Sequence, residues 1–238
     1  MQNMEINPPA ARSSAELWWA FLIILFTTIF YLFAVVVSQK APPSSELIGH
    51  SIGILGFTLM LMTELLYTLR KRIRDARWGR MSAWLRFHIV TGLVGPYMVF
   101  LHTAFKFNGL AGVVMLFTVI IVISGFIGRY IYTAIPRSAD GVEIEAQALA
   151  RYIAEIDARV QDLSSRAAED KNQLRKLDSL HKRQRALHRQ INALANTRRL
   201  LALWHTIHVP IGIVLFTAAF IHIIAAIYYA TLPRLLGQ

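Results

Sequence analysis

Long uninterrupted blocks of apolar side chains dominate the pattern along the chain. Five blocks approach or exceed the roughly 20 residues that an α-helix needs to cross a bilayer. They cover approximately residues 17–37, 47–69, 84–105, 109–135 and 202–232. The pattern predicts an all-α integral membrane protein with five transmembrane helices. The first block is too long for a signal peptide, so we expect it to be a retained anchor.

A polar stretch at residues 140–200 separates the fourth block from the fifth and has a different pattern. Apolar residues recur there every three or four positions, as at Ile153, Ile156 and Val160, which is typical of an amphipathic helix. The periodicity falters within residues 164–172. One unbroken helix would end about 90 Å from the membrane. Because the chain must return for the fifth block, we expect a helical hairpin.

These patterns divide the chain into four parts. Residues 1–16 are expected to form a polar tail, and residues 17–135 the first four transmembrane helices. Residues 136–201 are expected to form the amphipathic hairpin, and residues 202–238 the fifth transmembrane helix with a short tail. Spans two to five would then complete a four-helix bundle.

Positive charge is concentrated on one predicted side of the membrane. The chain has 25 Lys and Arg against 14 Asp and Glu, a formal net charge of +11. Seven of these cations fall within residues 70–86 and fourteen within residues 129–199, whereas the opposite loops hold only Lys40 and Lys106. Because cation-rich loops face the cytoplasm, we expect the N-terminus and the hairpin inside and the C-terminus outside, in a bacterial inner membrane. Topology thus explains the basic charge, and no nucleic-acid partner is expected.

The chain contains no cysteine. Disulfides, thiolate-ligated zinc, iron–sulfur clusters held by this chain, a cysteine nucleophile and covalently attached c-type haem are therefore excluded. Any haem would have to be held non-covalently, by histidine.

Four of the eight histidines lie inside apolar blocks at a repeated spacing. His88 and His102 are fourteen residues apart in the third block, as are His208 and His222 in the fifth. Fourteen residues make nearly four helical turns, so each pair shares a face and differs by about 21 Å in depth. Because the two blocks cross the membrane in the same direction, His88 is level with His208 and His102 with His222. Two facing imidazoles at each level match the axial positions of six-coordinate haem iron.

This arrangement resembles the di-haem membrane b-type cytochromes, in particular the ferric-reductase-like transmembrane and cytochrome b-like groups, over about residues 47–232. The resemblance implies two haems b and one-electron transfer across the membrane. It implies that His88 and His208 ligate the iron of an inner haem, and His102 and His222 that of an outer haem. No G-x-G-x-x-G motif follows a strand, so flavin chemistry would belong to another chain.

We therefore expect an electron-transfer subunit of a respiratory oxidoreductase complex, with no catalytic residue of its own. It would pass electrons between a quinone or quinol pool and a partner redox protein, which docks on the cytoplasmic hairpin or on the outer face. Two alternatives remain open. One is a haem-free helical transporter or structural membrane subunit, and the other is a transmembrane metal or oxygen reductase that relies on a separate flavoprotein.

Several residues near the predicted haem levels are candidates with competing structural explanations. Arg86, Arg129 and Lys106 could pair with haem propionates or could snorkel to the membrane interface. Gly92 and Gly95 could let a porphyrin approach the backbone, or could serve ordinary helix packing.

A quinone would need a proton-accepting group beside its ring oxygens, for which His50 and Glu64 are candidates. The alternative for each is a structural hydrogen bond between helices. His205 is expected to have an interfacial or propionate role. The hairpin could be a solvated structural element, a helix resting on anionic lipid headgroups, or a docking surface.

Overall fold

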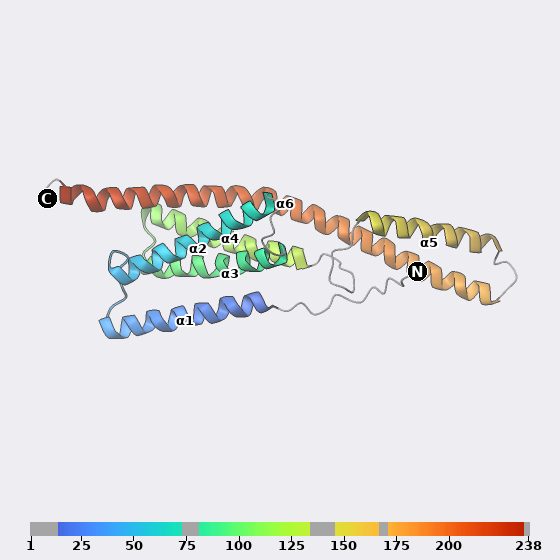
Figure 1. Ribbon diagram of the computed structural model, residues 1–238, viewed down its shortest axis with the longest axis horizontal. Coiled ribbons are helices and arrows are strands. Elements are labelled where there is room, and N and C mark those ends of the chain that lie inside the picture. Colours follow the sequence, from blue (N-terminus) through green and yellow to red (C-terminus); the bar gives the residue numbers. More distant parts are fainter. Residues whose placement is uncertain (1–13, 73–80, 134–145, 167–170, 236–238) are drawn as a thin grey trace. The chain divides into compact units, whose positions relative to one another are not determined.

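The computed structural model describes residues 14–72, 81–133, 146–166 and 171–235, and the regular elements in them are all α-helices (Figure 1). Five of the helices, α1, α2, α3, α4 and α6, contain a stretch long and apolar enough to cross a membrane. This confirms the predicted helical class and the five candidate spans. The predicted tail at residues 1–16 lies almost entirely outside the described residues. The helices are α1 (Ala15–Ser38), α2 (Leu47–Arg72), α3 (Met81–His102), α4 (Gly109–Thr133), α5 (Ala146–Arg166) and α6 (Lys171–Leu235).

Helix α6 differs from the predicted arrangement because it contains the fifth apolar block as part of one 65-residue helix. No helix boundary falls at residue 201, where the sequence pattern changes from polar to apolar. Residues 171–209 contain neither Gly nor Pro and are rich in Leu, Ala, Gln and Arg, so the backbone has no reason to leave the helix there. A change of environment along a helix does not require a break in it.

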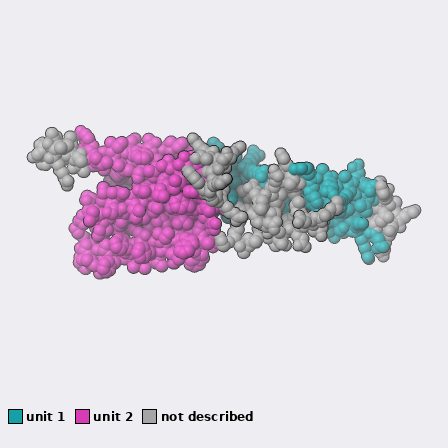
Figure 2. Space-filling view, in the orientation of Figure 1, with its two compact units in different colours: residues 1–12, 127–206 teal, residues 13–126, 207–238 magenta. Residues whose placement is uncertain are grey.

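The chain divides into two compact units, which Figure 2 distinguishes by colour. Residues 127–206 belong to one, and residues 13–126 with 207–238 to the other. We call them the α5 unit and the bundle unit. The first part of α6 belongs to the α5 unit and its last part to the bundle unit.

Within the α5 unit, α5 packs against the first part of α6 through an apolar cluster. Ile153, Ile156 and Val160 of α5 are buried there together with Leu187 of α6. Beside this cluster the amide of Gln184 donates a 2.8 Å hydrogen bond to the carboxylate of Asp157. The periodic apolar positions of α5 are therefore used against α6.

Within the bundle unit, helices α2 and α3 approach closely at a pair of glycines. A Cβ atom added to Gly56 would lie 2.8 Å from the carbonyl oxygen of Gly95, and one added to Gly95 would lie 2.9 Å from the carbonyl oxygen of Gly56. The missing side chains thus let the two backbones meet, as small residues do between membrane helices. Further along, the Thr63 hydroxyl donates a buried 2.7 Å hydrogen bond to the Thr91 hydroxyl, which links the same two helices.

The remaining helices of the bundle unit are joined by apolar clusters and one polar contact. Met60 of α2 is buried with Val114 of α4 and with Leu215 and Ala219 of α6. Helix α1 packs on α3, where the hydroxyls of Thr28 and Tyr97 are 2.6 Å apart. Helix α2 therefore contacts α3 and shares one apolar cluster with α4 and α6, the other two helices of the predicted bundle.

Candidate functional site

His102, the last residue of α3, is held in place by helix α2. Its Nδ1 lies 2.8 Å from the carbonyl oxygen of Gly49. A carbonyl oxygen can only accept a hydrogen bond, so the proton of the neutral imidazole must sit on Nδ1. The lone pair is then on Nε2, which is the nitrogen that a metal would use.

Gly53 provides the space that the His102 ring occupies. A Cβ atom added to Gly53 would lie 2.6 Å from both Cγ and Nδ1 of His102, which is closer than a Cβ atom approaches a non-bonded neighbour. Gly49 and Gly53 are four residues apart and share one face of α2. That face therefore offers the imidazole both a hydrogen-bond acceptor and room.

Two other histidines lie near His102. The rings of His50 and His102 are arranged edge to face, with their centroids 6.2 Å apart. His222 of α6 interacts electrostatically with His102. The structure thus places the His50 ring beside the predicted ligand His102, and the pairing of His102 with His222 stays a prediction.

His88, fourteen residues before His102 on α3, makes a similar contact. Its Nδ1 lies 3.2 Å from the carbonyl oxygen of Thr63 on α2. The same argument puts the proton on Nδ1 and the lone pair on Nε2. Because the Thr63 hydroxyl bonds to Thr91, the carbonyl belongs to a residue that is itself fixed between α2 and α3.

His208 of α6 is anchored by α4 rather than by α2. Its Nδ1 lies 3.0 Å from the hydroxyl oxygen of Ser124. A hydroxyl can donate or accept, so this contact allows either tautomer of the ring. Three of the four predicted ligands therefore engage a neighbouring helix through Nδ1, and they do so with three different partners.

The predicted charged and proton-accepting residues are dispersed around these histidines. Arg86 and Lys106 are exposed, and Arg129 is half-buried in the α5 unit. Glu64 is exposed and accepts a 3.5 Å hydrogen bond from Thr68 of its own helix. His205, in the α5 unit, contacts its own helix at the Leu201 carbonyl, 3.0 Å from Nδ1.

The glycines predicted between the ligands of α3 face α2. Gly95 makes the close approach to Gly56, and a Cβ atom added to Gly92 would meet the methyl carbon of Thr63 at 3.6 Å. Helix packing, which the sequence leaves open as the alternative, accounts for Gly95. Approach of a porphyrin to either glycine stays a prediction.

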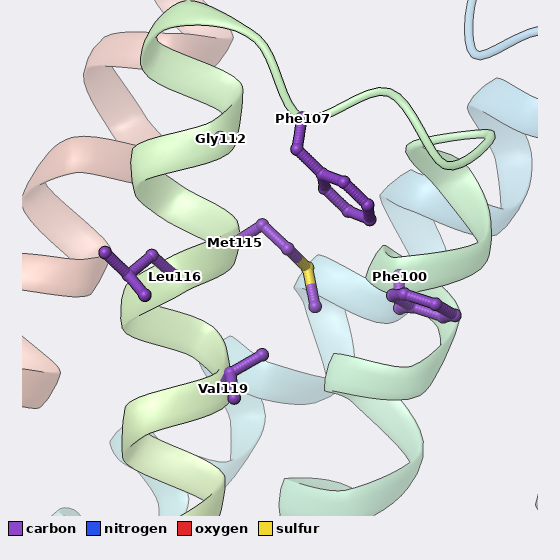
Figure 3. Close-up of a pocket in the computed structure, with 6 residues that line it drawn as sticks. All are labelled: Phe100, Phe107, Gly112, Met115, Leu116 and Val119. Carbon is purple, nitrogen blue, oxygen red and sulfur yellow. The ribbon is translucent and has the colours of Figure 1, made fainter.

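An apolar pocket of about 270 Å³ lies between α4 and the end of α3 (Figure 3). The rings of Phe100 and Phe107 are stacked 6.1 Å apart at one side, and the Met115 side chain extends from α4 into the space beside them. The other lining residues, Gly112, Leu116 and Val119, are also apolar. No titratable side chain lines this pocket, so it offers room without acid–base chemistry.

The chemistry available in this part of the bundle unit is that of imidazole. Within the described ranges, no group of three or more His, Asp or Glu side chains is arranged to hold a metal ion by itself. Sequence reasoning identified the histidines but missed Gly49, Gly53 and Ser124, which position them. The spacing Gly49-x3-Gly53-x2-Gly56, one glycine face on a helix, is the signal that could have shown two of these.

No family model, no curated protein and no solved structure matches the chain.

Proposed function

We propose that the protein is a di-haem b-type membrane cytochrome subunit that passes single electrons across a membrane. The observation that carries the proposal is the hydrogen bonding of the histidines on α3. His88 and His102 each direct Nδ1 to a backbone carbonyl of α2. Each therefore presents Nε2 as a ligand in a fixed tautomer, which is how metal-binding histidines are commonly held.

The residues present fit a haem better than a bare metal ion. A porphyrin supplies four of the six ligands of its iron, so two imidazoles suffice and no third protein ligand is needed. His102 of α3 and His222 of α6, which interact electrostatically, would form such a pair. When bound, haem supplies reversible one-electron chemistry at iron, while ligation and burial by this chain set its potential.

The chain's own side chains would perform three tasks. The histidines hold the iron, Gly49, Thr63 and Ser124 orient the imidazoles, and the apolar helices exclude water. The fourteen-residue spacing places two such sites about 21 Å apart along α3 and α6. Two sites at different depths give a route between the two faces of a membrane, which one site alone would not.

The orientation and partners belong to the same proposal. The cation-rich segments face the cytoplasm, with the N-terminus and the α5–α6 helical hairpin inside, which makes His88 and His208 the inner pair. Arg86, Arg129 and Lys106 are available to haem propionates. His50, beside His102, would serve a quinone at the outer level, and Glu64 would serve one nearer the inner level.

A reduced-minus-oxidised optical spectrum of the purified protein tests the proposal directly. We expect a b-type signal, with two haems per chain by the pyridine haemochrome assay. A stoichiometry near zero would instead favour a haem-free transporter or structural subunit, in which the same hydrogen bonds only join helices. Co-purification of a flavoprotein that reduces the haems and passes electrons to metal or oxygen would favour the reductase alternative.

A further inference from the structure

The α5 unit carries its positive charge unevenly. Residues 171–199 of α6 contain nine Lys and Arg and one acidic residue, Asp178, whereas α5 contains three cations and three acids. Positive charge near a membrane helix is expected from topology, but topology does not dictate which helix or which face carries it. The excess lies on α6 alone.

Four of the α6 cations whose side chains the structure describes lie on one face. They are exposed and fall within about 80° of the helix circumference, on the side opposite the buried Leu187. Two of the arginines are extended along the helix surface, because Arg185 and Arg189 each donate Nε–H to the backbone carbonyl one turn earlier, at 3.4 and 3.2 Å. We call this set the cationic stripe: Arg175, Lys182, Arg185 and Arg189.

The stripe contains little acidic compensation. Lys182 pairs with Asp178 at 2.8 Å, and this hydrogen bond holds the pKa of that carboxyl below its usual value. The arginines of the stripe carry guanidinium groups, which suit paired contacts with carboxylates. The surface therefore matches an acidic partner.

The packing of α5 on α6 decides between a lipid surface and a protein as that partner. A helix that rests in a membrane interface buries an apolar face among the headgroups. Here the apolar faces of both helices are buried against each other. Among the described residues of α5 and of α6 up to residue 199, Leu174 is the large apolar side chain that stays exposed. The exposed surface of this helix pair is charged and polar. Small redox complexes that form through charge use surfaces of this kind.

We propose that the cationic stripe binds an acidic, soluble one-electron carrier protein. This inference rests on the proposed function for the identity of the carrier, but the binding itself needs no haem. The stripe captures and orients the carrier by charge, which raises the rate of encounter and makes it sensitive to salt.

A flavodoxin, which is acidic, serves as the probe, with the full chain in discs of zwitterionic phosphatidylcholine. Binding is measured by fluorescence anisotropy and haem reduction by absorbance. The triple variant R175Q/R185Q/R189Q should weaken binding about tenfold at low salt. The matched control K176Q/R198Q/R199Q removes the same charge from the same helix outside the stripe. It should weaken binding by less than about threefold.

Several outcomes would overturn the inference. One is equal weakening in both triple variants, because net charge rather than the stripe would then be responsible. Another is the absence of salt-sensitive binding by the unmodified chain. A third is protection of the stripe from trypsin in discs with phosphatidylglycerol but not in phosphatidylcholine, which would assign it to lipid headgroups.

The two readouts separate this inference from the proposed function. Two haems per chain without flavodoxin binding would overturn the stripe alone. Stripe-dependent binding to a chain without haem would overturn the cytochrome proposal and, with it, the identity of the partner as an electron carrier.

Discussion

Both units of the molecule have apolar cores, but they expose different kinds of side chain, and the bundle unit also buries several hydroxyl groups. In the α5 unit, Leu187 and Ile156 are buried at 1% and 3% exposure, and the charges lie outside. In the bundle unit, Thr63, Thr91 and Thr118 are buried, while Phe26 and Phe33 are 72% and 65% exposed. Apolar burial therefore explains the association of α5 with α6.

In the bundle unit, burial of apolar side chains does not explain which faces of the helices pack together. Apolar side chains lie on both sides of these helices, so transfer from water cannot by itself decide which faces meet. Close approach at glycines and hydrogen bonds between helices decide it instead. The residues that matter most there are Gly, Thr, Ser and His, which makes it a unit where polar groups inside carry the specificity.

The largest expected effect concerns the polar interior of the bundle unit. If the proposed function is right, His222→Ala should remove one haem of two, because the iron at the His102 level would lose an axial ligand, and should leave the other in place. Haem per chain and the loss of one of two redox transitions measure this. His205→Ala, on the same helix but bonded to its own Leu201 carbonyl, is the control and should keep both haems. Equal loss of both haems in H222A would contradict two independent levels.

The next largest effect concerns Gly53, whose missing side chain leaves room for the His102 ring. Gly53→Ala places a methyl group 2.6 Å from the imidazole, so the ring or α2 must shift, and most of the haem at that level should be lost. Gly125→Ala on α4 is the matched control, because nothing lies within 4 Å of an added Cβ there. The control should keep both haems and gain a little helix stability. Unchanged haem content in G53A would show that the space beside the His102 ring is not required for haem binding.

A substitution in the apolar core of the α5 unit should change helix packing and leave haem content unchanged. Leu187→Ala should destabilise the packing of α5 on α6 by about 2–5 kcal/mol through lost burial and a cavity. Faster hydrogen exchange in both helices, with haem content unchanged, is the expected result. Leu174→Ala, at a position 54% exposed on the same helix, should change neither. If L187A left exchange unaltered, the contrast between the two units would fail.

The sequence predicts which segments form the apolar helices, because the length and apolar content of each block indicate a helix. It does not predict correctly where a helix such as α3 ends. The apolar run of the third block continues to Phe105, yet α3 ends at His102. Ala104 and Phe105 adopt left-handed backbone angles, with φ of 45° and 62°. A turn between two spans can be apolar, so composition alone does not show where the helix stops.

The sequence predicts the histidines of the candidate site but not the groups on other helices that contact them. The fourteen-residue spacing of the histidines is a property of single helices and can be read from the chain. The Gly49 carbonyl and the Ser124 hydroxyl act on residues 53 and 84 positions away. Those contacts depend on which faces of α2 and α4 meet the histidines, and in a bundle with apolar residues on all sides the periodicity does not specify those faces.

The smallest expected effect concerns Ser124, the one positioning group that is a side chain. With Nδ1–H of His208 donating to the hydroxyl, the imidazole is more basic and favours ferric iron. Ser124→Ala should then retain both haems and raise one midpoint potential. A hydrogen bond contributes about 0.5–1.5 kcal/mol, and 59 mV corresponds to a tenfold change for one electron, so the shift should be about 20–60 mV.

A redox titration that resolves the two transitions measures this shift. Thr217→Ala is the control, because its hydroxyl bonds only along its own helix to the Ile213 carbonyl, and neither potential should move. A potential that stays unchanged or falls in S124A would contradict donation of Nδ1–H to the serine hydroxyl. The absence of a second haem transition already in the unmodified chain would instead indicate that the serine donates to Nδ1, because Nε2 then carries the proton and does not ligate iron.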